Sequence, residues 1–310
     1  MTTPNGNRMK LLVGIMLIYI FPVRGSFAQD FLSTPPAIDQ VDSTSPLKVL
    51  SWNIYMLPPL AKFTGKQRRA KRIGNLLKDC DFDIFVFQEA FHGASRRKIW
   101  RRLKEHFPHK LGPANQRWYS FKTNSGIWMV SRIPLKQLGT IDFKECDGID
   151  CWSRKGALLA EGEFAGQTFQ ILGTHLEAGG SKELKEGQYR EIDTLLSQHR
   201  KASVPQLLCG DFNTHRNDSA LYDRMVGILG AQNASFDGEQ QFTSDGELND
   251  IKIGRGGKKK RSWIDYAFYR GNGVEADIQR FVRMPRSRWS KKFQDLSDHF
   301  AVEAQIRFEP

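Results

Sequence analysis

The stretch Gln206-Leu-Leu-Cys-Gly-Asp-Phe-Asn213 contains an apolar run that ends in a glycine, a carboxylate and an amide. A short apolar run bounded by turn-forming residues indicates a buried strand, here over residues 206–209. Polar side chains that come directly after such a strand emerge at one edge of the sheet, where a rigid element holds them in position. We therefore expect Asp211 and Asn213 to belong to a site built from strand ends.

The same arrangement recurs at five other predicted strands. These strands cover residues 47–54, 83–87, 168–176, 263–269 and 301–308, and the polar residues at or beside their ends are Asn53, Glu89, His175, Asp265 and the pair Asp298-His299. Taken singly, each residue has an ordinary explanation as a turn residue or a core histidine. Together they predict one cleft for metal-assisted phosphoester hydrolysis, because carboxylate and amide oxygens suit Mg²⁺ and a neutral histidine can act as a base.

The order of the predicted elements favours two packed sheets. Helices are predicted over residues 67–78, 95–106 and 182–199, and helices alternate with strands in the first half of the chain. In the middle and at the end, strands follow one another directly, as at 157–164 and 168–176. A wholly parallel sheet contains no such hairpins, so we expect mixed sheets packed face to face with the helices outside.

Length and composition exclude several classes of protein. The chain has 310 residues, of which 40% are hydrophobic and 26% are charged, values typical of a globular protein rather than of a disordered, collagenous or coiled-coil one. Only the N-terminus has an apolar stretch long enough to discuss as a membrane segment, which excludes a multi-pass membrane protein.

The N-terminus has the features of a secretory signal peptide. Basic residues precede an apolar segment at 11–23, and the small-x-small sequence Ser26-Phe27-Ala28 follows it. Because this segment is shorter than the ~20 residues of a spanning helix, we expect a signal peptide at 1–28 rather than an uncleaved anchor, and a secreted or periplasmic protein. A flexible segment rich in Ser, Thr and Pro is expected at 29–46, followed by one catalytic domain at 47–310.

The mature chain is expected to remain strongly basic. Removal of Arg8, Lys10 and Arg24 with the signal peptide lowers the formal charge from +12 to +9. A basic surface attracts phosphate-rich partners, which leaves both nucleic acid and an anionic membrane open. Four runs are rich in basic residues, at 67–72, 96–104, 255–261 and 283–292.

Four cysteines are too few for a disulfide scaffold in a chain of this length. Cys146 and Cys151 lie five residues apart in a polar segment, and in an exported protein this spacing favours a small loop-closing disulfide. Cys80 and Cys209 lie beside apolar runs and are expected to be buried thiols. None of the four has the spacing of a structural zinc site.

The set of strand ends resembles the endonuclease/exonuclease/phosphatase superfamily. The resemblance covers residues 47–308 and rests on the segments Ser51-Trp-Asn53, Phe87-Gln-Glu89, Gly173-Thr-His175-Leu, Gly210-Asp-Phe-Asn213, Trp263-Ile-Asp265-Tyr and Ser297-Asp-His299. It implies a four-layered α/β sandwich with the active site at the strand ends. Within the superfamily the chain is most similar to the neutral, Mg²⁺-dependent sphingomyelinases, through the residues that follow Asn53, through the helical segment 67–73 and through the spacing of Asp150 and Lys155.

The resemblance also implies a role for each site residue. Glu89 would be the main Mg²⁺ ligand, with Asn53 and Asp298 beside it, and Mn²⁺ or Co²⁺ could replace Mg²⁺. His299 would be the general base that Asp265 orients, Asp211 and Asn213 would position water and phosphate, and His175 would donate to a phosphate oxygen. Asp150 and Lys155 would gate the substrate, which would be sphingomyelin, cleaved to ceramide and phosphocholine.

A sphingomyelinase must also reach lipid, so the resemblance implies a phospholipid membrane as partner, with no obligate protein partner. Trp289 and Phe293 lie among cations just before the last strand, and we expect them to be exposed and to contact the membrane. Three alternatives stay open: a secreted nuclease that uses the same catalytic residues and binds nucleic acid, an inositol-phosphate phosphatase, and a binding module without catalysis.

Overall fold

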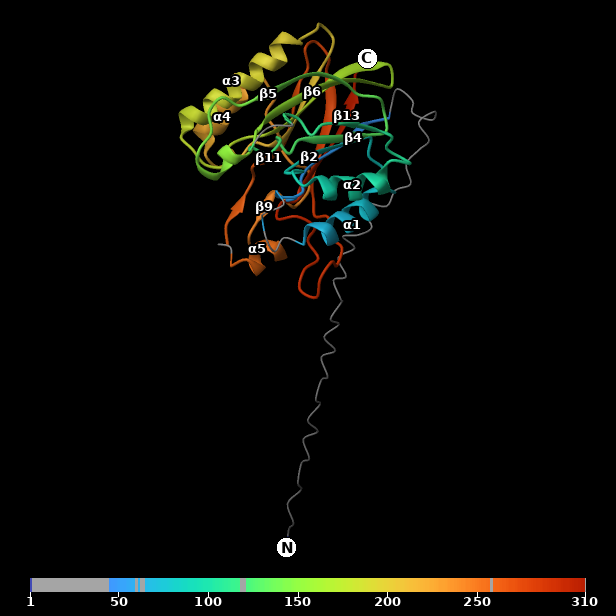
Figure 1. Ribbon diagram of the computed structural model, residues 1–310, viewed down its shortest axis with the longest axis vertical. Coiled ribbons are helices and arrows are strands. Elements are labelled where there is room, and N and C mark those ends of the chain that lie inside the picture. The colour runs from blue at the N-terminus through green and yellow to red at the C-terminus, as the bar shows by residue number, and fades with distance from the viewer. Residues whose placement is uncertain (2–44, 59–60, 62–64, 118–120, 257–258, 310) are drawn as a thin grey trace.

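The computed structural model describes Met1 and residues 45–58, 61, 65–117, 121–256 and 259–309 (Figure 1). The rest of the predicted signal peptide at 1–28, and residues 29–44 of the predicted flexible segment, lie outside the described residues. Among the helices that the structure describes, none is both long enough and apolar enough to span a bilayer.

The first sheet has six strands in the order β12-β13-β1-β2-β4-β3. β1 is parallel to β2, and its other neighbour β13 is antiparallel to it. In chain order the strands are β1 (Leu47–Asn53), β2 (Ile84–Gln88), β3 (His109–Leu111), β4 (Trp128–Ser131), β12 (Ala276–Arg283) and β13 (Ala301–Phe308). This sheet is therefore mixed, as the sequence predicts.

The second sheet has five strands in the order β11-β8-β7-β6-β5. β7 and β8 are parallel, and every other pair in this sheet is antiparallel. The strands are β5 (Lys136–Asp142), β6 (Gly156–Phe164), β7 (Gln167–His175), β8 (Gln206–Asp211) and β11 (Asp265–Arg270). A separate two-stranded ribbon pairs β9 (Ser244–Asp245) with β10 (Arg261–Ser262).

The central strands have apolar residues on both faces, which places a core on each side of each sheet. In β2, Ile84 and Val86 face the core between the two sheets, whereas Phe85 and Phe87 face a second core under α1 and α2. This alternation follows from the two-residue repeat of a strand. β2 is entirely buried, so its almost continuous apolar run is what a strand covered on both faces requires.

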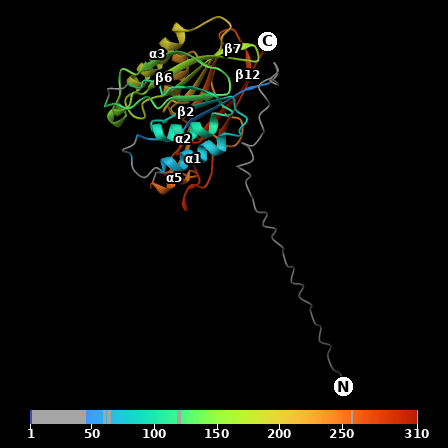
Figure 2. The same cartoon turned by 45° about the vertical axis from the view of Figure 1, so that its right-hand side comes forward.

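Helices cover the two outer faces. α1 (Lys66–Leu77) and α2 (Gly93–Leu103) lie side by side on the first sheet, and α3 (Lys182–Gln198) and α4 (Ser219–Leu229) lie on the second (Figures 1 and 2). Short helices occur at η3 (Gly148–Trp152) and α5 (Asp250–Gly254). The predicted fold class is confirmed: the molecule is a four-layered α/β sandwich of two mixed sheets with helices outside.

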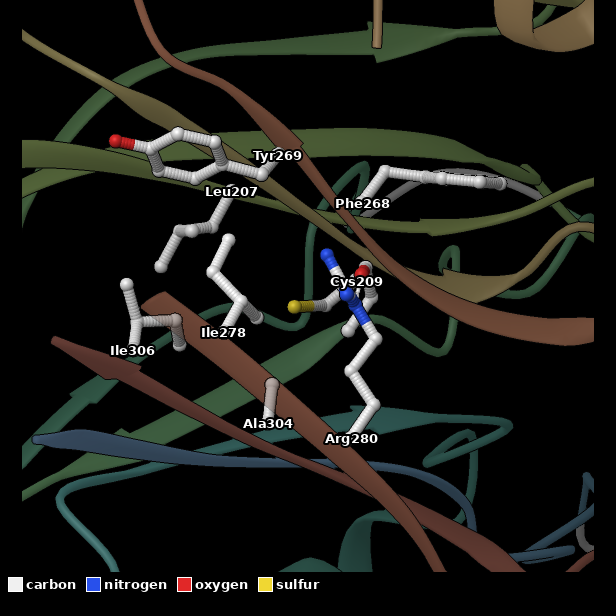
Figure 3. A pocket seen from close by; sticks show the side chains of 9 residues that line it. Leu207, Cys209, Phe268, Tyr269, Ile278, Arg280, Ala304 and Ile306 are labelled. Atoms are coloured by element: carbon white, nitrogen blue, oxygen red, sulfur yellow. Dashed lines mark hydrogen bonds between the residues drawn. The ribbon is translucent and has the colours of Figure 1, made fainter. Parts of the chain in front are cut away.

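A small cavity lies in the core between the sheets, lined by residues of β8, β11, β12 and β13 (Figure 3). Cys209 and the buried Arg280 face it, and Arg280 Nε donates to the carbonyl of Ala267 at 2.6 Å. Its free space is on the order of one water molecule, so it does not hold a substrate. Cys80 and Cys209 are both buried thiols, as the sequence predicts.

Candidate active site

The predicted site residues meet because of the directions of the strands. The parallel pairs β1/β2 and β7/β8 end at the same edge of the sandwich, and the antiparallel strands β11 and β13 begin there. The loop before β13 is tied to the end of β1: the Ser297 hydroxyl donates to the Asn53 carbonyl at 2.6 Å, and the Trp52 indole donates to the His299 carbonyl at 3.0 Å. Residues from six separate segments therefore surround one point.

Asn53 connects the two sheets at this point. Its fully buried Nδ2 donates to Glu89 Oε1 at 3.1 Å and to Asp211 Oδ2 at 3.1 Å. Its Oδ1 accepts from the backbone N–H of Tyr55 at 3.1 Å. An amide suits this position because it can donate to two carboxylates while it accepts from the backbone.

His299 is paired with carboxylates. Its Nδ1 lies 3.0 Å from Asp265 Oδ2 and 3.7 Å from Asp211 Oδ2. Burial alone would lower the pKa of His299, but the negative charges of Asp265 and Asp211 outweigh it and raise the pKa to about 10. In turn, burial and the charge of Asp265 raise the pKa of Asp211 to about 6. The histidine is thereby held in one orientation by a carboxylate, the arrangement that a general base needs.

Two carboxylate oxygens at the site have no partner among the described residues. They are Glu89 Oε2 and Asp298 Oδ1, and both atoms are buried. Burial, with the nearby charge of Asp298, raises the pKa of Glu89 to about 7. Buried polar atoms are almost always hydrogen-bonded, so these two oxygens suit a ligand such as a cation.

The backbone at the site is held in an uncommon conformation. Glu89, Tyr55 and Asn213 have φ values of 51°, 50° and 47°, in the left-handed region that residues other than glycine rarely adopt. Such conformations cost on the order of 1–3 kcal/mol each and are concentrated at functional sites. At Glu89 this turn follows directly on β2, and it places the carboxylate beside Asn53.

Two groups of residues at the site could hold a divalent cation. One is the buried group of Asp211, Asp265 and His299, whose ligand atoms all lie within 4.8 Å of one another. The other is centred on Glu89, with its unpartnered oxygen. Mg²⁺ prefers oxygen ligands, and His299 Nδ1 already contacts Asp265, so the unpartnered oxygen of Glu89 fits this ion better.

His175 also lies beside Asp211. Its Nε2 is 3.6 Å from Asp211 Oδ2 and 3.2 Å from Lys155 Nζ. Burial and the charge of Lys155 hold the pKa of His175 well below 6.5, so its ring is neutral. The ammonium of Lys155 can only donate, so Nε2 accepts and Nδ1 carries the ring hydrogen.

The residues proposed to gate the substrate adjoin His175. Lys155 Nζ lies 2.7 Å from Asp150 Oδ2, and Asp150 also accepts from the backbone N–H of Ala178 at 3.0 Å. Asp150 lies in η3. Cys146 and Cys151, the residue after Asp150, form the disulfide that their spacing predicts. The ion pair therefore connects a disulfide-braced turn to the histidine of the site.

Two buried cations at the site were not predicted. Arg69 is fully buried and donates to the carbonyls of Ile54, Tyr55 and Leu296. Lys185 donates to the Asn213 carbonyl at 2.9 Å, and burial lowers its pKa to about 8. Arg69 lies in α1 and Lys185 in α3, and both helices carry other basic residues that are exposed. The local sequence therefore does not distinguish the buried cation from its exposed neighbours.

Trp289 and Phe293 lie outside this cluster and differ from the prediction. Neither side chain is exposed: both are half-buried, and their rings stack with centroids 5.3 Å apart. The Trp289 indole N–H donates to the carbonyl of Asp295 at 2.7 Å. The expectation of an exposed aromatic is therefore wrong, because the tryptophan packs against the core beneath α1. Membrane contact through these two residues stays a prediction.

The four-layered sandwich, with its carboxylates, amides and histidines gathered at one edge, is the architecture of a known class of proteins. The chain belongs to the Endonuclease/Exonuclease/phosphatase family, whose model matches residues 50–299.

Among curated relatives, the chain is 28% identical to "Sphingomyelinase C" of Leptospira interrogans over 285 residues, which cover 83% of this chain and 51% of that protein. It is 26% identical to "Sphingomyelinase C" of Bacillus cereus over 312 residues, which cover 88% of this chain and 92% of that protein. The chain thus spans about half the length of the first relative.

Solved structures show the same fold. A variant of beta toxin from Staphylococcus aureus, crystallised with bound magnesium ions, superposes with a TM-score of 0.75. It is 22% identical, and the match covers 84% of this chain and 99% of that one.

Proposed function

We propose that this chain is a secreted, divalent-metal-dependent phosphodiesterase that hydrolyses sphingomyelin to ceramide and phosphocholine. The observation that carries the proposal is Asn53, which bridges Glu89 and Asp211 beside the His299–Asp265 pair. This arrangement puts a free carboxylate oxygen and an oriented histidine around one point. The substrate is supported by the relatives named sphingomyelinase C and by the adjoining Asp150–Lys155 pair.

In this mechanism His299 takes a proton from the attacking water, and Asp265 holds its ring in place. The pKa of His299 is high because Asp211 and Asp265 carry negative charge beside it. A positive charge near these carboxylates would lower the pKa of His299, so that its imidazole could accept a proton from water. Asp211 and Asn213 would position the water and the phosphate.

Glu89, with Asn53 and Asp298 beside it, would hold the divalent cation, which when bound polarises a phosphoryl oxygen and stabilises charge on the leaving oxygen. Mg²⁺ is the expected ion, and Mn²⁺ or Co²⁺ could take its place. His175 would donate to a phosphate oxygen. Because Lys155 donates to His175 Nε2 in the described arrangement, Lys155 must move away and the ring hydrogen must shift from Nδ1 to Nε2 before that nitrogen can donate to the substrate.

The test is a substrate panel with Mg²⁺, in which the purified chain is offered sphingomyelin vesicles, phosphatidylcholine vesicles, plasmid DNA, RNA and inositol phosphates. We expect release of phosphocholine from sphingomyelin above all other reactions. Cleavage of DNA with no release from sphingomyelin would favour the nuclease instead.

A variant pair links the activity to the site. His299→Ala is expected to lower the rate at least ~10²-fold, because general base catalysis typically contributes that much. His106→Ala, at an exposed histidine of another loop, is the matched control and should retain full activity. Near-normal turnover by folded His299→Ala protein would reject the role of His299 as base.

A further inference from the structure

Three large apolar side chains on two neighbouring segments are exposed to solvent. The exposed fractions are 102% for Phe121, 87% for Ile149 and 69% for Trp152. Other than the terminal Met1, these are the most exposed large hydrophobic residues that the structure describes. Single exposed apolar residues are ordinary, but a group of them marks a surface that contacts something.

Backbone hydrogen bonds hold the two segments together. The N–H of Thr123 donates to the Trp152 carbonyl at 2.9 Å, and the N–H of Arg154 donates to the Thr123 carbonyl at 3.1 Å. Phe121 lies two residues before Thr123, and Ile149 lies in the same short helix η3 as Trp152. The Cys146–Cys151 disulfide links Cys151, within this helix, to Cys146 just before it. The three apolar side chains are thus presented by one braced structure.

This structure has two functionally different sides. Asp150, between Ile149 and Trp152, turns inward and pairs with Lys155 at 2.7 Å, which in turn contacts His175. The apolar neighbours of Asp150 turn outward. A surface that contacts Ile149 and Trp152 would therefore lie close to the Asp150–Lys155 pair and, through it, to His175.

The charges around the patch are mixed in sign. Lys122 adjoins Phe121, and the exposed Lys144, Glu145 and Asp147 precede Ile149. A phosphocholine headgroup carries both a phosphate and a quaternary ammonium, so it can meet charges of either sign. With two cations and two acids, these residues have no net charge that would favour a purely anionic surface.

We propose that Phe121, Ile149 and Trp152 form a membrane-docking patch that inserts into the headgroup region of a zwitterionic phosphocholine bilayer. The inference rests on the proposed function and adds to it the surface by which the enzyme reaches its lipid. Tryptophan and other aromatic residues favour the interface between water and bilayer. This patch is separate from Trp289 and Phe293, whose membrane contact the sequence predicts.

Flotation with phosphatidylcholine vesicles in EDTA tests the patch without hydrolysis. The variant Ile149→Ser/Trp152→Ser is compared with Leu248→Ser/Ile253→Ser, which removes the two other exposed apolar residues, near α5. We expect the first variant to lower the vesicle-bound fraction at least ~10-fold, since burial of one such side chain corresponds to roughly a tenfold gain in partition. The second variant should bind like the parent chain.

A third variant, Phe121→Ser, lies on the other segment and keeps the test independent of the fold of η3. Undiminished flotation of both patch variants would overturn the proposal, and so would selective loss of binding in Leu248→Ser/Ile253→Ser. Binding abolished by 0.5 M salt, a concentration chosen to screen charge, would point to the basic surface instead and would also overturn it.

The same samples separate this proposal from the proposed function. Vesicle binding through the patch, without release of phosphocholine from sphingomyelin in Mg²⁺, would refute the enzyme activity and leave the docking surface standing. Hydrolysis of sphingomyelin by the parent chain, with flotation unchanged in every patch variant, would refute the docking surface alone.

Discussion

Replacement of Arg69 by methionine should destabilise the fold strongly. The guanidinium has no exposed surface, and it donates to three carbonyls, those of Ile54 at 2.9 Å, Leu296 at 2.8 Å and Tyr55. Ile54 and Tyr55 directly follow the site residue Asn53, and Leu296 precedes the loop that carries His299. Arg69 therefore holds together two segments that are remote from each other in the sequence.

The magnitude follows from the three acceptors. A buried polar group left without a partner costs about 1–3 kcal/mol, and the methionine regains part of that by its own burial. We expect Arg69→Met to lower the free energy of unfolding by about 3–5 kcal/mol, because three buried carbonyls lose their donor at about 1–3 kcal/mol each and the methionine offsets only part of that loss. Arg69→Lys should lower the free energy of unfolding by less than Arg69→Met, because an ammonium can still donate hydrogen bonds. Some loss is expected, since the ammonium lacks the forked geometry of a guanidinium.

The assay is urea unfolding of the purified chain, followed by circular dichroism. Arg72→Met is the matched control, since Arg72 lies on the exposed face of the same helix, where substitutions usually change stability by no more than about 0.5 kcal/mol. A loss below about 1 kcal/mol in Arg69→Met, with an unchanged dependence on urea, would refute the structural role of this arginine.

Four further predictions follow from the site and its surroundings. Asp265→Asn should lower kcat by roughly 10²–10⁴-fold, because His299 loses the carboxylate that orients it. Mg²⁺ should raise the Tm of the parent chain but not that of Glu89→Gln, because a ligand that binds only the folded state stabilises it. Burial raises the pKa of Asp83 to about 6. The stability that its protonated form contributes is therefore present below about pH 4 and is lost as the pH rises through about 6. In Asp83→Asn, the free energy of unfolding measured in urea should not show this decrease. Cys146→Ser/Cys151→Ser should lower the free energy of unfolding by about 2 kcal/mol, the chain-entropy value for so short a loop.

Each of these has a result that would contradict it. Asp277→Asn, at an exposed acid, is the control for Asp265 and should leave kcat unchanged. Equal Mg²⁺-induced shifts in Tm for the parent chain and Glu89→Gln would exclude Glu89 as a metal ligand. An identical pH dependence of unfolding in Asp83→Asn and the parent chain would refute the raised pKa. No loss of stability on removal of both cysteines would show that the turn is held by its hydrogen bonds alone.

The elements that the sequence predicted well are those that carry their own signal. β2, β7, β8 and β13 are buried strands with apolar runs, and their observed bounds agree with the predicted ones within one or two residues. The edge strands β5 and β12 were missed. Half or more of their residues are not buried, so their pairing is decided by the neighbouring strand rather than by their own pattern.

Basic residues illustrate the same limit. The sequence showed two basic runs that became α1 and α2, and most of their cations are exposed as expected. It could not single out Arg69, because the carbonyls that this residue meets come from a loop 15 residues before it and another more than 200 residues after it. A contact across such a distance leaves no trace in local periodicity.

The sequence by itself determined the fold class and the identity of the clustered polar residues. Buried strands, and the polar residues at their ends, can be recognised from local hydrophobic patterns and composition. Only the tertiary structure decided how those residues pair: Asn53 to Glu89 and Asp211, and His299 to Asp265. It also decided which aromatics face solvent, leaving Trp289 half-buried and Trp152 exposed. Pairing and exposure depend on distances between segments remote in the chain, and those distances exist only once the sheets have packed.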